Sequence, residues 1–97
     1  MAKVQWLPHY DSEGKDDGKG AYLIYSPADD EYVPFDERWT FNGDFEKPTF
    51  RPSMLLNASL PGRKRNHFFV TDGKIQYLSD CEHDMKGLTI DMVECNY

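Results

Sequence analysis

The stretch HFFVTDGKIQYL, residues 67–78, decides the fold class because it carries the signature of a β-hairpin. Its centre, Asp72-Gly73, is a dipeptide that two-residue hairpin turns favour, and it lies between two runs rich in β-branched and aromatic residues. Such a turn pairs Thr71 with Lys74. One face of the hairpin is then wholly apolar and is predicted to face the core: Phe68, Val70, Ile75 and Tyr77.

Outward from the hairpin, turn-forming residues interrupt the chain roughly every 8–12 positions, which is typical of an all-β protein. Residues 53–60 alternate apolar and polar side chains and predict a half-buried strand, whereas Pro48 and Pro52 predict an extended edge or crossover segment before it. Residues 28–37 are expected to form a loop. We therefore expect a small antiparallel sandwich or partly open barrel of about six strands around the Asp-Gly hairpin. The predicted strands cover residues 3–7, 22–25, 38–41, 53–60, 67–71, 74–78 and 88–93.

The length of 97 residues predicts one domain over residues 1–97, in which the acidic, glycine-rich residues 11–20 form a mobile loop. We see no signal peptide at the N-terminus, and no apolar run approaches the roughly 20 residues needed to cross a bilayer. The chain has two cysteines, Cys81 and Cys95. Free thiols in a reducing cytosol are favoured over a disulfide between them. These features predict a cytoplasmic protein without a membrane partner.

The net charge of −6 is concentrated in the first half of the chain. Residues 1–50 hold 11 acidic and 5 basic side chains, whereas residues 51–97 hold 6 of each. This balance argues against direct nucleic-acid binding, because phosphates would be repelled. The excess predicts either a surface that binds a basic protein partner or a solvated acidic face that keeps the protein soluble. The candidate partner-binding residues are Asp29, Asp30, Glu31, Asp36 and Glu37.

Residues of metal-ligand type gather at one end of the hairpin. His67 begins the first hairpin strand, and Cys81 and His83 follow the second strand closely. One thiolate and two imidazoles suit zinc, which takes four ligands in a tetrahedron. The fourth ligand would be Asp80, Cys95, His9 or water.

Two other interpretations of this cluster remain open. In the first, His67, Cys81 and His83 have no chemical role and are hydrogen-bonded residues of a loop. In the second, Cys81 is a nucleophile and a histidine is its base. The flanking carboxylates of Asp80, Glu82 and Asp84 oppose the latter, since they raise the pKa of a thiol. No glycine-rich phosphate loop, paired-carboxylate spacing or nucleophile elbow is present, so no catalytic residue is predicted.

Four segments resemble a known family when taken in order: WTFNGD at 39–44, KPTFRPS at 47–53, the hairpin at 67–78, and DCEH at 80–83. They resemble a family of small uncharacterised phage and prophage proteins, often mislabelled "ammonia monooxygenase", over roughly residues 38–93. Members have histidines at the positions of His67 and His83, and often a cysteine where this chain has Asn66. The resemblance implies a phage accessory protein in the bacterial host cytoplasm and no monooxygenase chemistry.

Two functions follow as hypotheses. The first is a non-enzymatic phage accessory protein that binds and modulates a host protein, for example as an anti-defence inhibitor, with zinc as a candidate stabilising ion. The alternative is a small metal-dependent hydrolase or ligand-binding enzyme that uses His67, Cys81 and His83.

Overall fold

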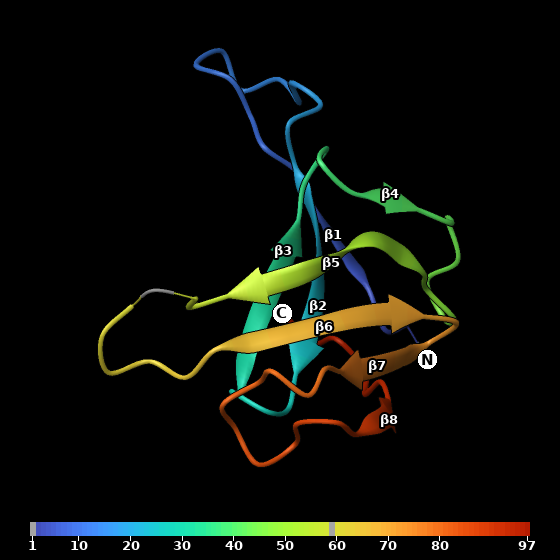
Figure 1. The fold of residues 1–97 in the computed structure, drawn as a ribbon. Coiled ribbons are helices and arrows are strands. Elements are labelled where there is room, and N and C mark those ends of the chain that lie inside the picture. The colour runs from blue at the N-terminus through green and yellow to red at the C-terminus, as the bar shows by residue number, and fades with distance from the viewer. Residues whose placement is uncertain (1, 59) are drawn as a thin grey trace.

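The computed structural model describes residues 2–58 and 60–97, which form eight antiparallel strands in two sheets (Figure 1). The predicted all-β, antiparallel fold is confirmed. The first sheet has the order β1 (Gln5–Leu7), β2 (Ala21–Ser26), β3 (Glu31–Phe35). The second has the order β4 (Thr40–Phe41), β5 (Phe50–Leu56), β6 (Asn66–Thr71), β7 (Lys74–Tyr77), β8 (Thr89–Asp91).

The core lies between the two sheets, whose strands cross each other in Figure 1. Phe35 from the first sheet stacks on Phe50 from the second, with 4.2 Å between ring centroids. Phe68 and Tyr77 complete this aromatic centre, and all four side chains are almost fully buried. Burial of such large rings contributes strongly to the hydrophobic free energy of folding.

The central hairpin has the predicted register. Thr71 pairs with Lys74, and the apolar residues between the two sheets are those expected from the alternation. Asp72 and Gly73 have φ values of 50° and 76°, as a turn with two left-handed residues requires.

The largest departure from expectation is β3, which lies within the predicted loop 28–37. Val33 and Phe35 are buried while Tyr32 and Pro34 are exposed, so the segment alternates as a strand does. Pro34 is tolerated because β3 is an edge strand, where a missing N–H costs no ladder hydrogen bond. The prediction followed the acidic composition and overlooked this alternation.

Strand β5 begins earlier and ends earlier than predicted. It includes Phe50 and stops at Leu56, since Asn57 adopts a left-handed φ of 61°. Ser59, within the predicted strand 53–60, lies outside the described residues. The register of β5 against β6 shifts between Phe50 and Met54, which is the mark of a β-bulge. A β-bulge changes the direction in which individual side chains point, and Ser53 lies within this one.

The remaining expectations concern the chain ends and the loop 11–20. Strands β1 and β8 are shorter than predicted, at three residues each. In the loop, the Asp11 carboxylate accepts hydrogen bonds from the backbone N–H groups of Glu13 and Lys15. The mobility of this loop stays a prediction. Within the described residues, no helix has the length and apolarity to cross a membrane.

Candidate active site

The outer face of the second sheet brings together a serine, a histidine and an aspartate. The Ser53 Oγ lies 2.9 Å from Nε2 of His67. On the other side of the ring, Nδ1 of His67 lies 3.1 Å from Oδ2 and 3.2 Å from Oδ1 of Asp80. A hydroxyl, an imidazole and a carboxylate joined in this order form the arrangement by which serine hydrolases activate their nucleophile.

Strand pairing places the first two residues. Leu55 of β5 pairs with His67 of β6, and both side chains point away from the core. Ser53 precedes Leu55 by two residues and therefore shares its face of the sheet. The bulge that ends at Met54 sets how Ser53 approaches the imidazole.

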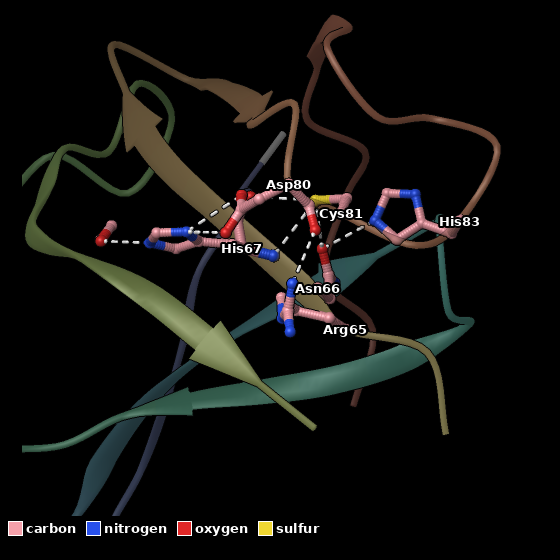
Figure 2. A network of polar contacts seen from close by, with 7 residues as sticks. Arg65, Asn66, His67, Asp80, Cys81 and His83 are labelled. Carbon is pink, nitrogen blue, oxygen red and sulfur yellow. Dashed lines mark hydrogen bonds and ion pairs between the residues drawn. The ribbon is translucent and has the colours of Figure 1, made fainter. Parts of the chain in front are cut away.

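Two hydrogen bonds between Arg65 and Glu82 hold Asp80 beside His67. The N–H of Arg65 donates to Oε1 of Glu82 at 2.7 Å, and the N–H of Glu82 donates to the carbonyl of Arg65 at 2.9 Å. The Arg65 guanidinium also reaches the carbonyl oxygen of Asp80 at 3.4 Å. The loop after β7 is thus tied to the start of β6, and Figure 2 shows the His67 ring turned towards Asp80.

Cys81 contacts the main chain of His67 and not its imidazole. The backbone N–H of His67 donates to Cys81 Sγ at 3.2 Å, and the same sulfur lies 3.2 Å from the His67 carbonyl oxygen. Cys81 is buried and, like Cys95, is a free thiol, as the sequence favoured.

His83 belongs to a different, buried network. Its Nε2 lies 2.9 Å from Oδ1 of Asn66, and its Nδ1 accepts the N–H of Met85 at 3.1 Å. Because Nδ1 acts as an acceptor, Nε2 carries the proton and the ring is neutral. Burial lowers the pKa of His83 from its ordinary 6.5, although the carboxylates of Asp29 and Asp84 oppose this shift. Figure 2 shows His83 on the far side of Cys81 and Asn66 from His67.

The predicted zinc ligands therefore have separate partners. His67 faces Ser53 and Asp80, Cys81 contacts main-chain atoms, and His83 bonds to Asn66. Among the residues that the structure describes, no group of three or more His, Cys, Asp or Glu side chains is placed to hold a metal ion. Zinc binding stays a prediction, to be checked by metal analysis of protein purified without a histidine tag.

The acidic residues predicted to bind a partner lie at the two ends of β3. Asp29 turns inward, and its Oδ2 accepts a hydrogen bond from Asn66 at 3.2 Å. Asp30 accepts the hydroxyl of Tyr25, and Glu31 pairs with an arginine at position 63. At the other end, the neighbouring arginine at position 38 lowers the pKa of the Asp36 carboxyl by hydrogen bonding, and Glu37 is exposed. Partner binding by these residues stays a prediction.

Two of the three residues in the hydrogen-bonded chain were missed as functional residues. Ser53 counted only as a polar position on a half-buried strand, and Asp80 only as a possible fourth metal ligand. The available signal was that Ser53 and His67 both fall on the polar faces of predicted strands. Without the pairing of those strands, nothing in the sequence places them side by side.

Comparison with known families supplies the remaining observation. The model of a family described as the bacterial ubiquitination-like system serine protease (BubE) matches residues 26–78, more than half of the chain. The chain belongs to the BubE family. The region of the BubE match contains Ser53 and His67 and ends two residues before Asp80. Neither the curated proteins nor the solved structures contain a match.

Membership of the BubE family corrects the predicted family and both predicted functions. The resemblance to phage and prophage proteins was wrong as an assignment, and so were both functions derived from it and from the cluster. The physical cause lies in the distribution of the site along the chain. Ser53, His67 and Asp80 are separated by 14 and 13 positions, so no compact motif reveals them, whereas Cys81 and His83 lie only two positions apart.

Proposed function

We propose that this member of the BubE family is a serine protease of a bacterial ubiquitination-like system, with Ser53 as its nucleophile. His67 serves as the general base, and Asp80 orients the imidazole. The observation that carries the proposal is the unbroken chain of contacts from Ser53 Oγ through both ring nitrogens of His67 to the Asp80 carboxylate. The family match supports the same chemistry independently. The cytoplasmic location expected from the sequence is retained as part of the proposal.

The chemistry follows from these contacts. Nε2 of His67 takes the hydroxyl proton of Ser53 as Oγ attacks the carbonyl carbon of the scissile bond. The imidazolium then gives that proton to the departing amine, which leaves an acyl group on Oγ. Water releases the acyl group by the same two proton transfers in the second half of the cycle. Throughout, Asp80 accepts the Nδ1–H and stabilises the positive charge on the ring.

The site is accessible to a polypeptide. The side chains of His67 and Asp80 are 24% and 48% exposed, and Ser53 is partly exposed. The carbonyl of Ser53 accepts a hydrogen bond from the indole of Trp39 at 3.4 Å. Trp39 also lines a pocket of about 240 Å³ with Phe35 and Trp6 of the first sheet.

A fluorophosphonate probe tests the assignment, because it reacts covalently with activated serines. We expect labelling of the native chain at Ser53, located by peptide mass spectrometry, and no labelling of Ser53→Ala. Ser12→Ala, which removes an exposed hydroxyl from the loop 11–20, serves as the matched control and should label normally. Equal labelling of Ser53→Ala and the native chain would refute the proposal.

A further inference from the structure

Strand β5 holds the proposed nucleophile and also has an unpaired edge. We infer that the substrate binds there as an extended segment, which adds one strand to the second sheet beside Leu55. This inference rests on the proposed function and specifies the form in which the substrate reaches Ser53.

The hydrogen bonding of β6 determines the direction in which the main-chain N–H and C=O of Leu55 point. The carbonyl of His67 accepts the N–H of Leu78 at 2.9 Å, so the polar main-chain groups of His67 face β7. Leu55 and His67 are Cα partners across β5 and β6. They therefore form a non-hydrogen-bonded pair, and the N–H and C=O of Leu55 point away from β6.

The main-chain carbonyl of Ser53 points in the same direction as the N–H and C=O of Leu55. It lies two residues before Leu55 and at the same edge, where the indole of Trp39 donates to it. Strand β4 pairs with β5 only at Phe50 and Arg51. Within residues 2–58 and 60–97, no strand pairs with β5 at Leu55 on that side. Leu55 itself is 49% exposed.

An unpaired strand edge of this kind binds a polypeptide backbone in an extended conformation. Unpaired N–H and C=O groups are a template for a further strand, and β-strand addition uses them for affinity. A segment paired with Leu55 has its next residues beside Ser53, where the carbonyl to be attacked must lie. Beyond Ser53 the edge is closed by Trp39 and β4, so the segment leaves the sheet there. The geometry thus fits an unstructured tail or linker of a substrate protein, whose main chain is free to pair with Leu55.

Two phosphonate probes of equal length test the inference. One carries four alanine residues in front of the reactive phosphonate, and the other carries a hydrocarbon chain. Alanine offers almost no side-chain contact, so the ratio of their labelling rates at Ser53 reports main-chain pairing. Two strand hydrogen bonds should favour the peptide probe by about tenfold, which corresponds to about 1.4 kcal/mol.

Leu55→Pro removes the outward N–H and should reduce this ratio to about one, whereas Leu55→Ala keeps the N–H and should retain most of it. The hydrocarbon probe makes no strand hydrogen bonds, so a general effect of a substitution on the site lowers both labelling rates together and cancels in their ratio. N-methylation of the peptide probe should abolish its advantage on the native chain without any change in the protein.

The two proposals fail in different ways. A native chain that labels at Ser53 with equal rates for both probes overturns edge binding and leaves the protease assignment intact. A Leu55→Pro chain that keeps the full advantage of the peptide probe also overturns edge binding. If neither probe labels Ser53, the proposed function itself is wrong, and the inference falls with it.

Discussion

Asn66 and His67 are neighbours in sequence, yet they belong to two polar networks on opposite faces of β6. His67 points outward and lies between Ser53 and Asp80, with part of its side chain exposed. Asn66 points inward, is fully buried, and bonds to His83 and Asp29. The outer network is accessible to substrate, whereas the inner one lies under the sheet.

The difference shows that the surroundings of a histidine decide its role. Both nitrogens of each ring are engaged by protein groups, but those of His83 contact the buried Asn66 amide and a backbone N–H, and burial lowers its pKa. His67 instead faces a hydroxyl that a reaction can deprotonate. Substitutions on the outer face should therefore abolish activity without unfolding the protein, and substitutions on the inner face should do the reverse.

The largest expected effect is on the outer face. Asp80→Asn should lower the rate of fluorophosphonate labelling by about 10⁴-fold, because the imidazole loses the partner that fixes its tautomer and orientation. The thermal melting curve should be unchanged, since Asp80 is half exposed. Asp84→Asn, an exposed carboxylate of the same loop, is the control and should label at the native rate. Normal labelling of Asp80→Asn would remove Asp80 from the site.

Asn66→Ala should mainly affect stability. It leaves the Nε2–H of His83 and the Oδ2 of Asp29 without their partner inside the protein. The free energy of unfolding should fall by about 2–3 kcal/mol. Each kcal/mol lowers the melting temperature of a domain of this size by roughly 4–8 °C.

Exposed Asn96→Ala serves as the control for this change and should melt as the native chain does. Labelling of the folded fraction of Asn66→Ala should remain within about a factor of three. If Asn66→Ala melted normally but lost labelling, the separation of the two networks would be wrong.

The smallest effect is a pH dependence of stability from His83. Its pKa in the folded state lies below the ordinary 6.5, so the unfolded chain takes up the proton first as the pH falls. This contribution to stability is complete above pH 6.5 and is lost as the pH falls through the folded pKa. His83→Gln keeps a donor towards Asn66 but does not titrate. Urea unfolding between pH 7 and 5.5 should show a steeper loss for the native chain, and equal slopes would contradict the assignment.

The fold was more predictable from the sequence than the site. The Asp72-Gly73 turn and the alternation around it gave the correct hairpin register, since both depend on residues close in sequence. Strand β3 was missed although its alternation was present, because the acidic composition outweighed it. The site was mostly missed, because its three members come from β5, β6 and the loop after β7.

The sequence by itself determined the all-β class, the central hairpin and the inward and outward faces of its strands, because turn chemistry and side-chain alternation are local properties of the chain. Only the tertiary structure decided that Ser53 meets His67 and that His67 meets Asp80. Those contacts depend on which strand lies beside β6, on a bulge that shifts the register of β5, and on a loop fastened by Arg65 and Glu82. Each is a long-range pairing set by the packing of the whole sheet, and no short stretch of sequence encodes it.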